Sequence, residues 1–170
     1  MRRTLPICLA LLVAPLGVFG QKVTTEFDES LDFSKYKTFA WREGRIQSKH
    51  PALDNSLVEK RIRNLVVAQL KAKGLNETSG RPDLVATYAL GARDRKEVER
   101  APAGWRGRRI RREVHQYTQG TLILDLRDPA QKDLVWRAVC TDTARDPAKF
   151  EQHIDSDVKK AFEKFPPKKK

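Results

Sequence analysis

The stretch Phe27–Trp41, FDESLDFSKYKTFAW, places five aromatic residues within fifteen positions of a chain that is only 8% aromatic. Asp32, Ser34 and Lys35 form a polar interruption in its middle. The pattern predicts the end of one strand, a turn closed by Asp and Ser side chains, and a second strand from Tyr36. Large aromatic side chains bury more area per residue than any other type. We therefore expect this stretch to anchor the core, with a ligand-stacking surface as the alternative.

Residues 1–20 have the pattern of a cleaved export signal. Two arginines precede an apolar run, Leu5–Phe19, that is shorter than the roughly 20 residues needed to span a membrane. The predicted cleavage falls between Gly20 and Gln21. Cys8 lies within the apolar run and no cysteine follows the predicted cut, so the pattern does not indicate a lipoprotein. We expect a periplasmic or secreted protein with no membrane-spanning segment after cleavage.

Residues 21–167 are the right length for one domain, followed by a basic tail, Lys168–Lys170. Cys140 is the only cysteine after the predicted cut, so the domain has no internal disulfide, and we expect a buried, inert thiol. The formal charge of +12 falls to +10 when the two signal arginines are removed. Such a basic protein is attracted to anionic surfaces.

Hydrophobic periodicity predicts five strands and two helices. The first helix spans Asp54–Lys73, with Ser56 and Glu59 as a capping box or Asp54 as an earlier N-cap, and it ends at Gly74. The apolar stripe of this helix contains Leu57, Val58, Ile62, Leu65, Val66, Gln69 and Leu70. The second helix opens at Asp146 and Pro147 and ends before Pro166 and Pro167, and its apolar residues are Phe150, Ile154, Val158, Ala161, Phe162 and Phe165. The predicted strands are 22–28, 36–42, 84–90, 114–126 with a kink or bulge at Gly120, and 134–141.

Between these elements we expect polar connections at 44–51 and 76–82, and a long, mobile connection at 91–113 broken by Pro and Gly. The last two strands should form a hairpin across the turn 127–133. The order ββαβββα, with two amphipathic helices, predicts an α+β fold. In this fold a mostly antiparallel sheet carries both helices on one face.

No catalytic motif is recognisable. The three histidines, His50, His115 and His153, lack a second metal ligand at suitable spacing, and we predict no metal or cofactor. Asp125 and Asp128 lie close together at a strand end. They could serve a hydrolase, although Asp on either side of a turn is ordinary turn chemistry.

The strongest functional signal is the basic segment 93–112. It interleaves an aromatic with arginines, which bind phosphates through paired hydrogen bonds, while a tryptophan can stack on a base or lie at a lipid headgroup. We consider it a candidate polyanion site for lipopolysaccharide, phospholipid or nucleic acid; the alternative is a solvated loop. Its candidate residues are Trp105, Arg106, Arg108, Arg109, Arg111 and Arg112.

Several motifs taken together resemble the DUF4136 family, which comprises exported bacterial proteins of unknown function. In order they are DFSKYKTFAW, LKAKGL, PDLVATY, GTLILDLRD, LVWRA and a final Lys-Phe-Pro-Pro, and they extend over Val23–Pro167. Many members resemble lipoproteins, but Gln21 stands where the lipidated cysteine would be. The matching positions are Asp32, Phe33, Tyr36, Thr38, Trp41, Gly74, Pro82, Asp83, Gly120, Thr121, Leu122, Asp125 and Trp136.

The resemblance implies no established reaction, cofactor or catalytic residue. Three hypotheses follow from the sequence. The leading one is a non-enzymatic envelope accessory protein that binds an unidentified partner protein or the cell surface. The second is a polyanion binder that acts through segment 93–112, and the third is an uncharacterised hydrolase.

Overall fold

The computed structural model describes residues 22–48, 53–103, 109–144 and 148–167. The predicted export signal and basic tail lie outside these ranges. Neither described helix is long and apolar enough to cross a membrane. The elements are β1 (Lys22–Phe27), the 3-10 helix η1 (Phe33–Lys35), β2 (Thr38–Trp41), β3 (Arg45–Gln47), α1 (Ser56–Ala72), β4 (Asn76–Glu77), β5 (Leu84–Ala103), β6 (Arg109–Asp128), β7 (Asp133–Ala144) and α2 (Ala148–Glu163).

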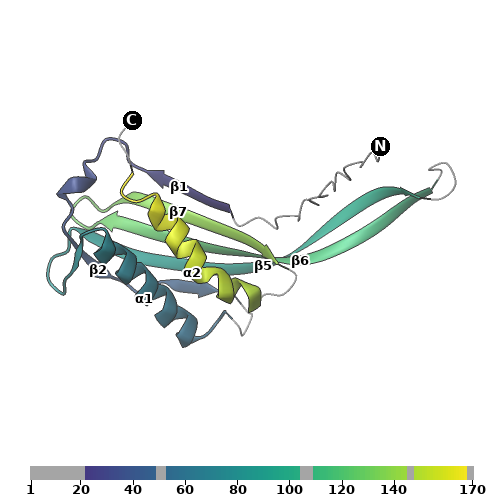
Figure 1. The fold of residues 1–170 in the computed structure, drawn as a ribbon, viewed down its shortest axis with the longest axis horizontal. Coiled ribbons are helices and arrows are strands. Elements are labelled where there is room, and N and C mark those ends of the chain that lie inside the picture. Colours follow the sequence, from purple (N-terminus) through teal and green to yellow (C-terminus); the bar gives the residue numbers. More distant parts are fainter. Residues whose placement is uncertain (1–21, 49–52, 104–108, 145–147, 168–170) are drawn as a thin grey trace, which may run out of the picture.

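The strands form one sheet in the order β1-β7-β6-β5-β2-β4, and β3 pairs with β5 beside β2. The β1–β7, β6–β7 and β5–β6 pairs are antiparallel, whereas the short pairs β2–β5, β2–β4 and β3–β5 are parallel. Both helices lie on the same face of the sheet (Figure 1). The predicted α+β fold, with a mostly antiparallel sheet and two helices on one face, is therefore confirmed.

The aromatic stretch Phe27–Trp41 does anchor the core. Asp32 closes its turn by accepting hydrogen bonds from the backbone and hydroxyl of Ser34. Phe33 then packs edge-on against Phe27, Tyr36 and Phe165, with ring centroids 5.9–6.3 Å apart. Edge-to-face aromatic pairs add to the stabilisation from buried area. The predicted turn and aromatic core are both observed.

Helix α1 differs from its prediction in two details. Its N-cap is Asn55, whose side chain accepts hydrogen bonds from the backbone N–H groups of Leu57 and Val58. The predicted capping box at Ser56 and the alternative N-cap at Asp54 were both wrong. The N-cap in extended conformation is Asn55, which lies between these two residues. The buried stripe consists of Val58, Ile62, Val66 and Leu70, while Leu57 is 73% exposed. The helix ends as predicted, at Gly74 with a φ of 87°.

Helix α2 packs across β7 and the middle of the sheet. Its predicted apolar face is buried, including Phe150, Ile154, Val158 and Phe162. Trp136 of β7 is fully buried against the rings of Phe162 and Phe165. The predicted N-terminal residues of this helix, Asp146 and Pro147, lie outside the described residues.

The prediction of a loop over residues 91–113 was wrong. Strands β5 and β6 continue their antiparallel pairing as far as Ala103 opposite Arg109. The argument from proline and glycine failed at Pro102, because the pairing runs through this residue opposite Ile110, while Gly104 and Gly107 lie outside the described residues. β6 has its only register shift at Leu126/Arg127, not at Gly120. The short strands β3 and β4, predicted as polar connections, were also missed. The predicted hairpin of the last two strands is confirmed as β6–β7.

Candidate functional site

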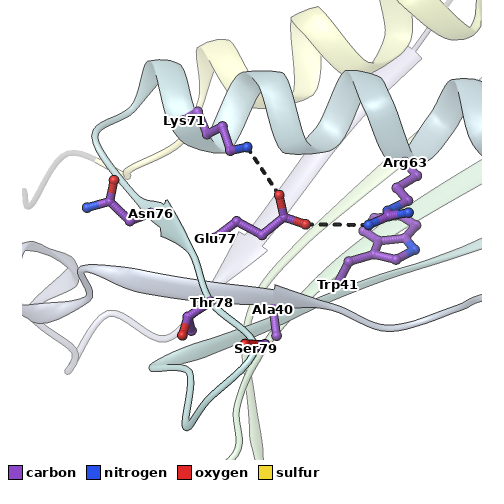
Figure 2. Close-up of a pocket in the computed structure, with 8 residues that line it drawn as sticks. All are labelled: Ala40, Trp41, Arg63, Lys71, Asn76, Glu77, Thr78 and Ser79. Atoms are coloured by element: carbon purple, nitrogen blue, oxygen red, sulfur yellow. Dashed lines mark ion pairs between the residues drawn. The ribbon is translucent and has the colours of Figure 1, made fainter.

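An open groove of about 810 Å³ lies between α1 and the edge of the sheet formed by β2 and β4. Its volume falls within the range of about 300–1,000 Å³ that is typical of small-molecule sites. Figure 2 shows the residues that line it, and they come from three separate parts of the chain. They are Ala40 and Trp41 from β2, Arg63 and Lys71 from α1, and Asn76, Glu77, Thr78 and Ser79 from β4 and the residues after it.

Charged side chains cross the groove. The Glu77 carboxylate lies between two cations of α1, 3.1 Å from Lys71 Nζ and 3.6 Å from Arg63 Nη2 (Figure 2). Both cationic side chains are 54% exposed and Glu77 is 30% exposed. Ion pairs at such exposure contribute about 0–1 kcal/mol each, so their main effect is on where the charges lie. Two cations against one carboxylate leave the groove with one net positive charge.

Trp41 supplies the aromatic surface. One face of its ring stacks on Tyr88 of β5, with centroids 5.7 Å apart and planes 16° from parallel. The side chain remains partly exposed where it lines the groove. Within the aromatic stretch, Phe39 is fully buried, whereas Trp41, two residues later, borders a hollow.

The far wall of the groove is held by the backbone. Asn76 N–H donates to the Lys37 carbonyl and Thr78 N–H donates to the Phe39 carbonyl, both at 2.9 Å. The Asp83 carboxylate accepts from the backbone N–H groups of Lys37 and Thr38, and these bonds hold its pKa below the usual range. The wall therefore has a defined geometry before any ligand arrives.

Sequence reasoning missed this groove. It assigned Trp41 to an aromatic stretch that anchors the core and placed Asn76–Ser79 in a loop, and it gave Arg63 no role. No spacing rule links Trp41, Arg63 and Glu77, which lie on a strand, a helix face and the segment after that helix. The one available signal was the polar run Asn76–Ser79. It follows soon after Gly74, where the helix ends, so the run stays beside the last helical turn.

The predicted polyanion site falls at the end of the long hairpin. Trp105, Arg106 and Arg108 lie outside the described residues. Arg109, Arg111 and Arg112 belong to β6, at register positions opposite Ala103, Ala101 and Arg100 of β5. Residues 95–103 and 109–117, here named the β-arm, pair only with each other in the described structure, because β7 pairs with β6 no further than Thr118. Figure 1 shows them projecting away from the rest of the sheet.

The base of the β-arm is well packed. Thr118 Oγ1 donates to Asp94 Oδ1 at 2.9 Å, across the register pair that these two residues form. Two residues further along β6, Gly120 lies under the ring of Phe150, and a Cβ placed there would come within 2.7 Å of that ring. A glycine is therefore required for α2 to approach the sheet at this point.

The two carboxylates considered for a hydrolase have separate structural roles. Asp125 forms a two-point pair with Arg137, with both N···O distances 2.7 Å. Asp128 accepts from the backbone N–H groups of Ala130 and Gln131, as expected of turn chemistry. It also accepts from the Tyr36 hydroxyl, and burial together with the Asp128 charge raises the pKa of Tyr36 to about 12.

A further set of titratable groups lies between β7 and α2. His153 Nδ1 contacts the buried carboxylate of Asp142, while His50 and the side chain of His115 lie outside the described parts. Burial raises the pKa of the Cys140 thiol to about 12, which fits the expected inert thiol. Burial, and secondarily the Asp142 charge, raises the pKa of Asp157 to about 6. Within the described ranges, no group of three or more His, Cys, Asp or Glu side chains is placed to hold a metal ion.

These features define an α+β domain with an open antiparallel sheet, two helices on one face, an edge groove and a projecting hairpin. The family model for DUF4136, a domain of unknown function, matches residues 23–167. The chain belongs to this family, as its motifs had indicated. A comparison with curated proteins found no match.

Several solved structures share the fold. A PDZ domain protein from Parabacteroides distasonis is 15% identical with a TM-score of 0.59, over 87% of this chain, which spans only 36% of that protein. A DUF4136 family protein from Bacteroides thetaiotaomicron is 12% identical with a TM-score of 0.51, covering 86% and 96% of the two chains. A homolog of a neuraminyllactose-binding hemagglutinin from Helicobacter pylori is 13% identical with a TM-score of 0.52, covering 79% and 88%. At these identities the likeness concerns the fold alone.

Proposed function

We propose that this protein is an exported, non-enzymatic accessory protein of the cell envelope that binds a partner through its β-arm. Export to the periplasm or beyond is supported by the signal pattern of residues 1–20. A binding role is consistent with a structural neighbour described as a homolog of a neuraminyllactose-binding hemagglutinin. The non-enzymatic assignment is supported by the carboxylates at Asp125 and Asp128, both of which serve structural contacts.

The observation that carries the proposal is the β-arm itself. It is a ribbon of two strands that extends past the last residues paired with β7 and β3. A two-stranded ribbon is marginally stable on its own in water, and its two edges present unpaired backbone groups. Such edges are what an added strand from another chain pairs with. The described strands of the ribbon pair only with each other, so their outer edges are open to a partner.

To test this, a photo-crosslinking residue would be placed in living cells at position 97 or 116 of the β-arm, with position 131 in the β6–β7 turn as the matched control. We expect a discrete crosslinked product from the β-arm positions and none from the turn. Equal labelling from both sites, or no product from either β-arm position, would contradict the proposal.

A second candidate function, polyanion binding, is favoured by charge. Residues 95–117 contain eight Arg or Lys and three Glu residues, a net charge of +5 within 23 residues. Binding to phosphate groups weakens steeply with salt, because each neutralised phosphate releases counterions. Lipopolysaccharide, anionic phospholipid vesicles and a generic nucleic acid would each be titrated across a salt series. The comparison variant carries serine at Arg106, Arg108, Arg109, Arg111 and Arg112.

Salt-sensitive binding that disappears in the serine variant would support this second function. Binding that persists in the variant, or that is indifferent to salt, would exclude the arginines as its cause. A protein crosslink that survives in the serine variant would identify backbone edge pairing, rather than charge, as the basis of recognition.

A further inference from the structure

The groove beside Trp41 has a chemistry different from that of the β-arm. The Trp41 indole has one face stacked on Tyr88, which holds the ring in place. The ring is partly exposed and borders the groove. The C–H groups on one side of a pyranose ring are apolar and pack on such an aromatic face. The hollow beside this ring is open and is bordered mostly by polar residues, as a sugar with many hydroxyl groups requires.

The charges across the groove indicate that the sugar ring bound there carries one negative charge, as each ring of a polyuronate does. Arg63 and Lys71 lie on either side of Glu77, and the three groups together leave one positive charge. A guanidinium forms paired hydrogen bonds with a carboxylate. Glu77 would repel a doubly charged phosphate, whereas its oxygens accept hydrogen bonds from sugar hydroxyls. The set therefore matches a carboxylate attached to a hydroxyl-rich ring.

The polar wall provides the remaining contacts. Asn76, Thr78 and Ser79 line the groove and carry an amide and two hydroxyls that can donate to and accept from ring hydroxyls. Thr78 Oγ1 already accepts from the Gly80 N–H at 3.1 Å, which orients this hydroxyl. Because the wall is fixed to β2 by backbone hydrogen bonds, little ordering accompanies binding.

We propose that this groove is a binding site for an acidic saccharide, a pyranose sugar that carries a carboxylate. The ring stacks on Trp41, the carboxylate binds Arg63 and Lys71, and the hydroxyls bind Glu77 and the Asn76–Ser79 wall. This site is separate from the β-arm, so it does not depend on the function proposed above.

The test is an NMR titration of the full chain after signal removal, observing the indole N–H of Trp41 and the backbone amides of residues 76–79. The probe is trigalacturonate, and its methyl ester serves as the uncharged counterpart. We expect shifts confined to the groove, with the ester binding about tenfold or more weakly because the charge-assisted bonds are lost. Inorganic phosphate serves as the plain anion, and a mononucleotide as the aromatic anion.

Variants assign the residues. Arg63→Gln and Lys71→Gln should each weaken trigalacturonate binding by about tenfold. Arg61→Gln is the matched control, since Arg61 is also a half-exposed arginine of α1 but pairs with Asp155, away from the groove. It should bind as the unmodified protein does. Trp41→Phe should retain part of the binding that Trp41→Ala loses, and circular dichroism would verify that each variant is folded.

Several results would overturn the proposal. One is the absence of groove shifts with trigalacturonate at tens of millimolar. Another is equal binding of the acid and its ester, and a third is an equal loss in the Arg61→Gln control. If phosphate or the mononucleotide produces the same shifts at lower concentration, the site belongs to a different ligand class. An arm-deleted protein that still binds trigalacturonate separates this result from the function of the β-arm.

Discussion

The helix-covered part of the sheet and the β-arm are made from the same two strands but are stabilised in different ways. In the covered part, β6 is paired on both sides and its Leu122, Leu124 and Leu126 are buried under the helices. In the β-arm, β5 and β6 pair only with each other among the described elements. Burial stabilises the first region, while the second is held by one ladder of backbone hydrogen bonds. The difference indicates that the covered part supports the fold and the β-arm is available for contact.

The strongest way to break the covered part is to remove its central side chain. Trp136 is fully buried between β7 and α2, so Trp136→Ala should lower the free energy of unfolding by about 3–5 kcal/mol. Urea unfolding followed by circular dichroism would measure it. Trp136→Phe is the control and should lose clearly less. A small loss for alanine would mean that α2 is not part of the cooperative unit.

The junction between the two regions should be the next most sensitive place. Gly120→Val places a branched side chain against the Phe150 ring, so we expect a loss of about 1–3 kcal/mol in the free energy of unfolding. Phe150→Leu in the same chain should recover part of that loss by making room. The losses of the two single variants, added together, give the loss in the free energy of unfolding expected if the positions are independent. If the double variant loses no less than this sum, the clash is not the cause.

A smaller effect, which depends on pH, is expected at the buried carboxylate of α2. The pKa of Asp157 is about 6 in the folded protein, above the ordinary value of 3.8, because burial and the Asp142 charge disfavour its ionised form. The folded state then binds more protons than the unfolded state between these values, so this group lowers stability as pH rises from about 4 to 6.

Asp157→Asn removes that titration. Relative to the unmodified protein, the variant should become more stable by about 1–2 kcal/mol as pH rises from 4 to 7. Thermal unfolding midpoints measured across this range would detect the change. Asp155→Asn is the control, because the pKa of Asp155 is lowered by its hydrogen bond with Arg61, so that variant should lose stability towards neutral pH. Parallel curves for Asp157→Asn and the unmodified protein would contradict the assignment.

The smallest effect is expected from removing the β-arm. Replacing residues 95–117 by Asn-Gly would join Asp94 to Thr118, which are already paired, through a two-residue hairpin turn. The unfolding free energy of the remaining domain should change by no more than about 0.5 kcal/mol, because the β-arm pairs only with itself. A domain that no longer folds would show that the β-arm is part of the core, and it would contradict the difference between the covered sheet and the β-arm.

Much of the fold could be predicted from the local pattern. The apolar spacing of α1 and α2, the alternation of β1 and the end of α1 at Gly74 all depend on neighbours within a few residues. The errors have equally local causes. Arg45–Gln47 and Asn76–Glu77 become strands only because β5 and β2 provide an edge to pair with. The segment 91–113 was predicted as a loop because its composition favours turns, whereas its register is continued from the paired strands below it.

The two candidate sites also differ in whether they could be predicted from the sequence. The basic character of the β-arm is visible in the sequence, since charge adds up along a contiguous segment. The groove is not, since Trp41, Arg63 and Glu77 become neighbours only through the packing of α1 beside β2 and β4. Family membership, the two helices and the aromatic core could therefore be predicted from the sequence alone. Strand order, the length of the β-arm and the groove were decided by the tertiary structure, because they depend on pairing and packing between residues far apart in the chain.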